Sequence, residues 1–319
     1  MTSLPGCATH AIRAGGCDLT HHGEVPRGIL PTFRRWAKLL LCGLLLWQTA
    51  WADAPPRIIH YGPTGAIYDY RWALLALALQ HTRGSDGPWR LEPFDEQGFS
   101  QDRTIALLLH GELDITAFGY TPEREAILRP VRIDLLRGML GYRLLLIRAD
   151  RQAYFSHLDV SAFRRDVILG FNSQWADLAV LQANNLRLVT SPHYDNLFAM
   201  LNARRFDAFP RGLNEVRREL QHFGPVYPDL AVEQGWALYM QDPVYFWVRK
   251  GDGALAARIE RGLNLALADG SFKALFLSYH GKDIAAAAYT HRRVIVLNNP
   301  YLPRWYVPSD TGWWWPHHP

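Results

Sequence analysis

The stretch that decides the fold is QDRTIALLLHGELDITAF, residues 101–118. Residues 101–110 predict a helix, and Gly111 follows at the position where a helix commonly ends in a left-handed cap. Leu113–Phe118 then predicts a buried strand. A helix that leads through a glycine into a strand is typical of chains in which the two kinds of element alternate.

The residues before this stretch continue the alternation. Arg57–Tyr61 predicts a strand that ends at Gly62-Pro63, and residues 69–82 predict an apolar helix. Residues 89–94 alternate in the manner of a short strand. A strand–helix–strand–helix–strand order predicts a parallel sheet with crossover helices.

The residues after this stretch repeat the pattern. Met139–Ile147 is a long apolar segment and predicts a buried strand that leaves the first lobe. A second set of alternating elements follows, with strands at 166–171, 186–190 and 206–209 and helices at 176–184, 194–203 and 214–222. Val244–Val248 predicts a strand that returns to the first lobe. Residues 255–268 and 272–279 predict closing helices, with Asp269-Gly270 as the turn between them.

The chain therefore predicts an α/β protein of two lobes, joined by two hinge crossings, with a cleft between them. Open α/β sheets bind ligands at the carboxyl ends of their strands, and a double hinge lets the lobes close on a ligand. We expect these boundaries: a leader over 1–52 (signal-like over 27–52), the first lobe over 53–148 and 244–302, the second lobe over 149–243, and a C-terminal tail over 303–319.

The leader predicts export. Basic residues at 34–38 precede the apolar run Leu39–Trp47, and small residues follow at Ala50 and Ala52. This is the layout of a secretory signal peptide, with a cut near Ala52/Asp53 and a periplasmic mature chain. The apolar run is shorter than the roughly 20 residues that a membrane-spanning helix needs, and an uncleaved anchor is the alternative.

All three cysteines (Cys7, Cys17 and Cys42) precede the expected cut, so the mature chain would carry no thiol. Cys42 follows Leu41 inside the apolar run, which argues against a lipoprotein. Residues 1–26 are too long an extension for a signal peptide, and we interpret them as the product of a mis-assigned start codon.

The charge of the mature part argues against a nucleic-acid partner. The calculated pI is about 9.0, but five of the 34 Lys/Arg and two of the 30 Asp/Glu lie before residue 53, which leaves 29 basic against 28 acidic residues. Binding of nucleic acid needs a clustered positive surface, and the sequence has no basic stripe.

Four segments carry a resemblance to a known family. They are Leu109–Ile115, the turn Thr121-Pro122-Glu123-Arg124, Leu201–Ala208, and Leu255–Phe276 with Asp269–Phe272 inside it. In this order they resemble the extracellular solute-binding proteins of family 3, the polar amino-acid-binding class, over residues 57–282. The resemblance implies a type 2 periplasmic-binding fold, a small-molecule ligand and an ABC permease as partner.

The resemblance implies that Arg124 clamps a ligand carboxylate, because the guanidinium fork matches two carboxylate oxygens. The alternative is a surface arginine paired with Glu123 or Glu125. Aromatic residues near the expected cleft are candidates for its walls, although each could equally belong to the core. The first-lobe candidates are Arg124, Thr121, Tyr120, Tyr61 and Tyr68.

The second lobe supplies Ser173, Trp175 and Arg211 as candidates. Ser173 lies in a strand-to-helix loop that the family uses near the carboxylate, but it could equally be an ordinary N-cap. The family often places an ammonium-binding aspartate where this chain has Gly212, so that partner is missing unless Glu215 or Asn214 replaces it. We therefore expect Arg124 and Arg211 to favour an anionic or amino-acid-like solute, and Pro210 to interrupt its strand.

No motif for a nucleophile, a dinucleotide or a metal is present, so we expect no enzyme, no cofactor and no metal site. Two alternatives stay open. One is a ligand-sensing module for a membrane signalling protein. The other is a cyclohexadienyl-dehydratase-like enzyme, in which Glu215 or His193 would act as the acid or base. We expect a monomer, and we expect the Trp-rich end of the chain to be a loose terminus.

Overall fold

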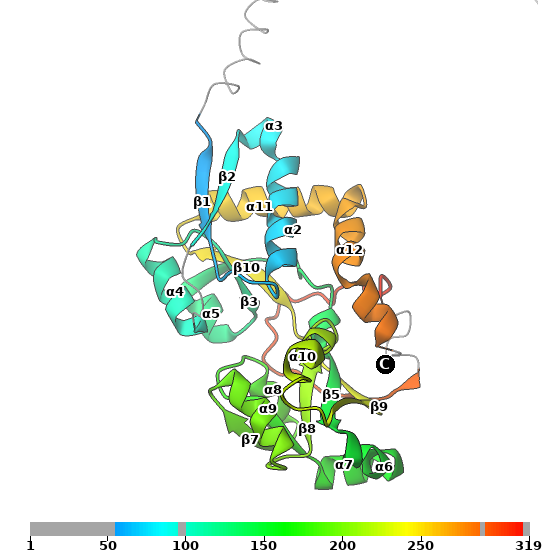
Figure 1. Cartoon of the computed structure of the whole chain (residues 1–319). Coiled ribbons are helices and arrows are strands. Elements are labelled where there is room, and N and C mark those ends of the chain that lie inside the picture. The colour runs from blue at the N-terminus through cyan, green and yellow to red at the C-terminus, as the bar shows by residue number, and fades with distance from the viewer. Residues whose placement is uncertain (1–54, 95–99, 288–290, 315–319) are drawn as a thin grey trace, which may run out of the picture. The chain divides into compact units, whose positions relative to one another are not determined.

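The computed structural model describes residues 55–94, 100–287 and 291–314 (Figure 1). The export segment, its cut site and the three cysteines lie outside the described residues, as do residues 315–319. Within the described ranges, no helix has both the length and the apolar character needed to cross a membrane.

The first lobe is built on a mixed sheet. β1 (Arg57–Tyr61) pairs in parallel with β2 (Trp89–Pro93), and β10 (Val244–Arg249) runs antiparallel to β3 (Thr116–Gly119) and β4 (Leu128–Val131). A parallel bridge between Tyr61 and Ile115 links the two groups, which gives the strand order β2-β1-β3-β10-β4.

Six helices accompany this sheet among the described residues. α4 begins at an N-cap in which Ser100 accepts the amide of Arg103, and it ends at Gly111, whose φ of +84° requires a residue without a side chain. Gly270 takes the same conformation between the last two helices. The helices are α2 (Asp69–His81), α3 (Arg83–Asp86), α4 (Gln101–His110), α5 (Pro122–Ile127), α11 (Gly253–Ala268) and α12 (Ser271–Ala286).

The second lobe repeats the first. Its sheet has the order β11-β9-β5-β8-β6-β7, and β7-β6-β8-β5-β9 corresponds strand for strand to β2-β1-β3-β10-β4. The strands are β5 (Tyr142–Arg148), β6 (Ile168–Asn172), β7 (Arg187–Ser191), β8 (Ala208–Gly212), β9 (Leu230–Tyr239) and β11 (Arg293–Val296). Its helices are α6 (Gln152–His157), α7 (Val160–Asp166), α8 (Leu178–Ala183), α9 (Tyr194–Asn202) and α10 (Val216–Phe223), with short 3₁₀ turns at Met139–Gly141 and Ala149–Arg151.

Each lobe contains one strand that the chain reaches by crossing from the other lobe. β5 follows β4 and pairs with β8 and β9, whereas β10 follows β9 and pairs with β3 and β4. Both strands are apolar and almost wholly buried, as expected for strands with neighbours on both edges and cover on both faces. The predicted two-lobed α/β fold with two hinge crossings is confirmed.

A single carboxylate connects the crossings. Asp134 accepts the amides of Leu136 and Gly138 in the first crossing, at 3.1 and 2.6 Å, and the amide of Val244 in the second, at 3.1 Å. Its Oδ2 also accepts the hydroxyl of Ser309 at 3.0 Å. Backbone hydrogen bonds from Leu135 to Val244, at 2.9 Å, and from Met240 to Gly141, at 3.1 Å, also join the two crossings.

The C-terminal segment differs from the expected loose tail. β11 lies in the region that we assigned to the first lobe, but it pairs in parallel with β9 of the second. Trp314 is 2% exposed and donates its Nε1–H to the Arg137 carbonyl at 2.9 Å. Trp305 donates to Glu125 at 2.8 Å. The expectation of a loose terminus is wrong for Trp313 and Trp314, because the first ring packs against Phe272 and Phe276 and the second is buried.

Two local expectations also differ from the structure. β8 continues through Pro210 to Gly212 on its β5 edge, but on its β6 edge it is paired only at Ala208. Pro210 therefore limits one edge of the strand without ending it. α8 begins at Leu178 rather than Ala176, with Asp177 as its N-cap residue, so Ser173 does not cap this helix.

Candidate functional site

A cavity of about 670 Å³ is lined by residues of both lobes. Its first-lobe wall comes from the start of α2 and from the segment between β3 and α5. Its second-lobe wall comes from the loop after β6, from β8 and from α9 and α10. The cavity therefore lies at the carboxyl ends of β3, β6 and β8, where ligands bind in open α/β sheets.

Arg124 lies in this cavity because of how α5 begins. Thr121 is the N-cap and accepts the Arg124 amide at 3.1 Å, and Pro122 occupies the first turn of the helix. The guanidinium donates to the Gly119 carbonyl at 2.7 Å and to the side chain of Gln101. Arg124 is only 8% exposed and forms no ion pair with any described carboxylate, so the alternative of a surface pair with Glu123 or Glu125 does not hold.

Arg71 and Tyr68 complete the first-lobe wall. Arg71 donates to the Ala117 carbonyl at 3.0 Å, and its guanidinium carbon lies 4.9 Å from the centre of the Tyr68 ring. Like Arg124, it is 8% exposed and has no carboxylate partner within ion-pair distance among the described residues. Burial lowers the pKa of both guanidiniums, which remain cationic.

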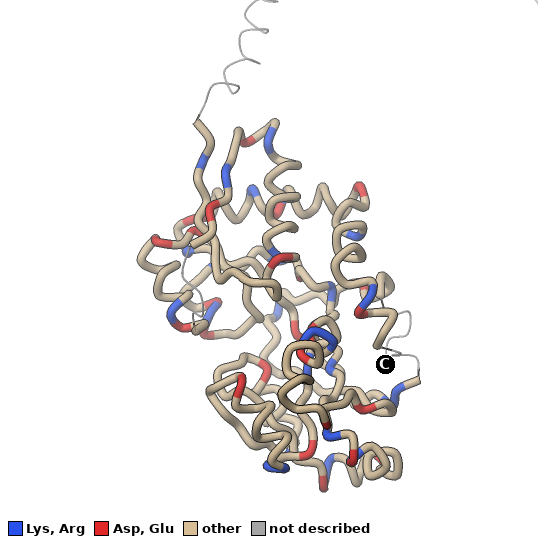
Figure 2. The backbone as a smooth tube through the Cα atoms, viewed as in Figure 1, with Lys and Arg blue, Asp and Glu red and all other residues tan. Residues whose placement is uncertain are grey.

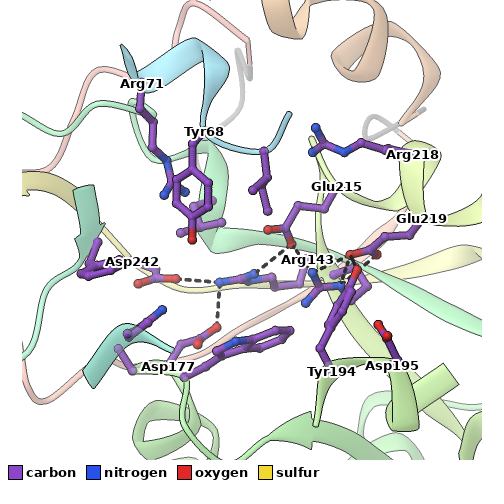
Figure 3. A pocket seen from close by; sticks show the side chains of 18 of the residues that line it. Tyr68, Arg71, Arg143, Asp177, Tyr194, Asp195, Glu215, Arg218, Glu219 and Asp242 are labelled. Carbon is purple, nitrogen blue, oxygen red and sulfur yellow. Dashed lines mark hydrogen bonds and ion pairs between the residues drawn. The ribbon is translucent and has the colours of Figure 1, made fainter. Parts of the chain in front are cut away.

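Two acid–arginine clusters form the opposite side of the cavity (Figure 3). In the first cluster, Arg143 on β5 donates to Asp177 at 2.7 Å and to Asp242 at 2.6 Å. Each cluster holds two carboxylates for one arginine. The first cluster therefore has one more carboxylate than it has guanidiniums next to the solute space.

The second cluster is formed by Arg211, Glu215 and Glu219. Arg211 lies 2.9 Å from Glu215 and binds both carboxylate oxygens of Glu219, with its Nε at 2.8 and 2.9 Å. Trp175 covers the guanidinium at 4.5 Å from its ring centre. Arg211 thus lines the cavity as expected, but its charge is already taken by two carboxylates. The contacts do not favour the anion-binding role that we expected for it.

Glu215 fills the space beside Gly212. Its Oε2 accepts the Gly212 amide at 2.9 Å, and a Cβ atom on Gly212 would lie 2.9 Å from the same oxygen. The carboxylate thus occupies the space into which a side chain at 212 would extend. Burial opposes the ionised form of Glu215, but Arg211 and Arg143 nearby lower its pKa overall.

Asp242 is an unusually weak acid for an aspartate. Burial and the neighbouring Asp177 raise its pKa to about 7, against the opposing effect of Arg143. The two carboxylates share one guanidinium, so one of them holds a proton more readily than an ordinary aspartate.

Four of the eight candidate residues line the cavity: Tyr68, Arg124, Trp175 and Arg211. The other four are not among its lining residues. Tyr61 packs against Trp72, with ring centres 4.8 Å apart, and Tyr120 donates to Glu125 at 2.7 Å and stacks on Trp247. Thr121 contributes as the N-cap of α5, where its hydroxyl accepts the Arg124 amide. Ser173 is exposed in the turn after β6.

The sequence argument missed Arg71, Arg143, Asp177 and Asp242. Arg71 lies in an otherwise apolar helix, and Arg143 lies in an apolar strand. A signal did exist for the second cluster, since Arg211, Glu215 and Glu219 are spaced four residues apart.

The dehydratase alternative needs an acid or base in the cavity. Glu215 lines the cavity, whereas His193 is exposed and is not among the lining residues. No group of three His, Cys, Asp or Glu side chains in the described ranges is arranged to hold a metal ion.

No family model matches the sequence, and no curated protein matches it. Solved structures are similar in fold. The VFT2 domain of BvgS from Bordetella pertussis, in a double-mutant form, is 17% identical, with a TM-score of 0.54 over 74% of this chain and 96% of that one.

Two binding proteins are similar as well. An amino acid ABC transporter substrate-binding protein from Streptococcus pneumoniae, bound to L-arginine, is 13% identical, with a TM-score of 0.51 over 72% of this chain and 93% of that one. A periplasmic His/Glu/Gln/Arg/opine family-binding protein from Silicibacter pomeroyi, in complex with lysine, is 14% identical, with a TM-score of 0.51 over 72% and 98%. At this identity the similarity shows the fold, which is the type 2 periplasmic-binding fold.

Proposed function

We propose that this chain binds an amino-acid-like solute in the cavity between its lobes and delivers it to an ABC-type permease from the periplasm. The observation that carries this proposal is the buried Arg124 guanidinium, which lines the cavity without a carboxylate partner among the described residues. A buried guanidinium is costly unless an anion pairs with it. A ligand carboxylate would supply that anion through two parallel hydrogen bonds.

The second-lobe wall suits the other end of an amino acid. The two clusters place four carboxylates next to two arginines, so this wall offers carboxylate oxygens to an ammonium group. Glu215 is the side chain best placed to accept it, because its carboxylate occupies the space next to Gly212. The solute would then contact both lobes at once, and its binding would favour closure about the hinge.

The size of the cavity supports a small solute. About 670 Å³ falls in the range of small-molecule sites and is far below what a folded partner would need. Trp175 and Phe118 provide apolar walls. The neighbouring binding proteins with arginine or lysine bound share the fold, and they support amino acids as the first compounds to test.

A thermal-shift screen of the purified chain with the 20 amino acids and their carboxylate analogues tests the proposal. A solute present at 100 times its dissociation constant stabilises the fold by about 2.7 kcal/mol. We expect at least one amino acid to raise the melting temperature of the wild type and of Arg83→Gln, a surface control on α3. The shift should be lost in Arg124→Gln. A screen without any shift, or an equal shift in Arg124→Gln, would contradict the proposal.

A further inference from the structure

Two arginines face the cavity from opposite lobes without a carboxylate partner. Arg71 belongs to α2 of the first lobe and Arg218 to α10 of the second, and both line the cavity (Figure 3). Arg71 donates to a backbone carbonyl, and Arg218 makes only a long hydrogen bond of 3.4 Å to the carbonyl of Asn214. No described carboxylate lies within ion-pair distance of either guanidinium.

The two guanidiniums act on each other and on a third group. Burial lowers the pKa of Arg71, and the positive charge of Arg218 lowers it further, although Glu215 and Asp242 oppose this. His280 on α12 is buried beside them, and burial together with both arginines lowers its pKa to about 3. The imidazole is therefore neutral at physiological pH, and the positive charge of this part of the cavity comes from the two guanidiniums.

None of the described carboxylates that line the cavity lies within ion-pair distance of Arg71 or Arg218. Glu215 and Glu219 are bound by Arg211, and Asp242 is bound by Arg143. Asp283, which lies close to His280 on α12, forms an ion pair with Arg217 at 2.6 Å. An anionic group from outside the chain would relieve the repulsion between Arg71 and Arg218.

We propose that the solute is an acidic amino acid, whose second carboxylate binds between Arg71 and Arg218 while its first carboxylate binds Arg124. This inference rests on the proposed function, since it names the solute class of the same cavity. Arg71 and Arg218 are then the residues that determine specificity. Because one belongs to each lobe, the side-chain carboxylate also connects the lobes in the closed state.

The same pair selects against other amino acids. A lysine or arginine ligand would place a cation against two guanidiniums, which is repulsive. A glutamine ligand has the shape of glutamate but lacks the charge, so it would leave Arg71 and Arg218 unneutralised. Charge-assisted hydrogen bonds are stronger than neutral ones, and the difference corresponds to about tenfold in affinity.

Isothermal titration of the purified chain with L-glutamate, L-glutamine and L-lysine tests this. We expect the wild type and the Arg83→Gln control to bind L-glutamate at least tenfold more tightly than L-glutamine, and L-lysine most weakly. Arg71→Gln and Arg218→Gln should each weaken L-glutamate binding by about tenfold and leave L-glutamine binding within about threefold. Arg124→Gln should weaken both ligands.

Several outcomes would overturn the inference. Equal or tighter binding of L-glutamine or L-lysine by the wild type would do so, as would equal losses for L-glutamate and L-glutamine in Arg218→Gln. If Arg71→Gln does not fold, Arg218→Gln decides alone, since Arg218 is partly exposed. Binding of a different amino acid but not L-glutamate would overturn the acidic class and leave the proposed function standing. Failure of every amino acid to bind would remove both.

Discussion

Glu215 places a carboxylate oxygen 2.9 Å from the position that a Cβ of Gly212 would occupy. A residue three positions along the chain thus fills the space of a side chain at 212, and it does so from the turn that begins α10. A carboxylate at this place in the cavity can therefore come from a side chain at position 215 or from one at position 212.

Gly212→Ala tests this relationship. The added methyl group would meet Glu215 Oε2 at 2.9 Å and Asn214 Oδ1 at 3.0 Å, so the carboxylate must move. We expect the affinity for the bound amino acid to fall by about tenfold, in line with a lost charge-assisted hydrogen bond. Titration with the des-amino analogue is the control, because its affinity should not change. A loss of equal size for both compounds would argue against Glu215 as the ammonium acceptor.

Asp242 predicts how stability depends on pH. Its pKa is raised to about 7 by burial and by Asp177, so between about pH 4 and pH 7 the folded chain keeps a proton that the unfolded chain has lost. This contribution is complete below pH 4, declines as the pH rises to about 7, and is gone above that.

Denaturant unfolding at pH 5 and pH 8 measures this effect. The wild type should be less stable at pH 8 than at pH 5 because of this group. Asp242→Asn should lose less than the wild type over the same interval. A pH dependence that is unchanged in Asp242→Asn would show that another group is responsible.

Trp314 predicts that the C-terminal segment stabilises the hinge. Its ring is buried against Tyr142, with centres 5.8 Å apart, and its Nε1–H is bonded to the Arg137 carbonyl. Trp314→Ala should lower the free energy of unfolding by about 3–5 kcal/mol through the cavity it leaves. Val307→Ala, at a residue that is 78% exposed, should change it by less than about 0.5 kcal/mol. If both variants changed the free energy of unfolding by the same small amount, the C-terminal segment would be only loosely attached to the hinge.

Two helical glycines predict opposite effects of the same substitution. A Cβ on Gly262 would lie 2.0 Å from the Ala78 carbonyl oxygen, because α11 packs closely on α2, whereas a Cβ on Gly281 of α12 would meet nothing within 4 Å. Gly262→Ala should destabilise the fold by about 1–3 kcal/mol. Gly281→Ala should stabilise it by about 0.5–1 kcal/mol, because alanine is the better helix former. Thermal unfolding of the two variants should show melting temperatures on opposite sides of the wild type.

The sequence predicts the repeated elements well, because their signals are local. Gly111 and Gly270 indicate helix boundaries, because glycine readily adopts the left-handed conformation found there. The apolar composition of β5 and β10 predicts buried strands. β9 was missed, since Leu230–Tyr239 mixes charged and small residues with apolar ones. β11 was missed because its identity as a strand depends on pairing with β9.

The cavity is harder to predict because its chemistry depends on distant partners. The local turn Thr121–Arg124 was enough to predict Arg124 as a site residue. Whether an arginine has a carboxylate partner, however, depends on residues far along the chain. Arg143 is neutralised by Asp177 and Asp242, which lie 34 and 99 positions away. Arg211 looked available and is paired, whereas Arg71 looked like an ordinary helix residue and is unpaired by any described carboxylate.

The most direct test of the central claim is the binding enthalpy of one amino acid titrated into the wild type and into Arg124→Gln. We expect saturable one-to-one binding of an acidic amino acid to the wild type and at least a tenfold loss of affinity in the variant. Equal affinities for the two proteins, with both folded, would contradict it.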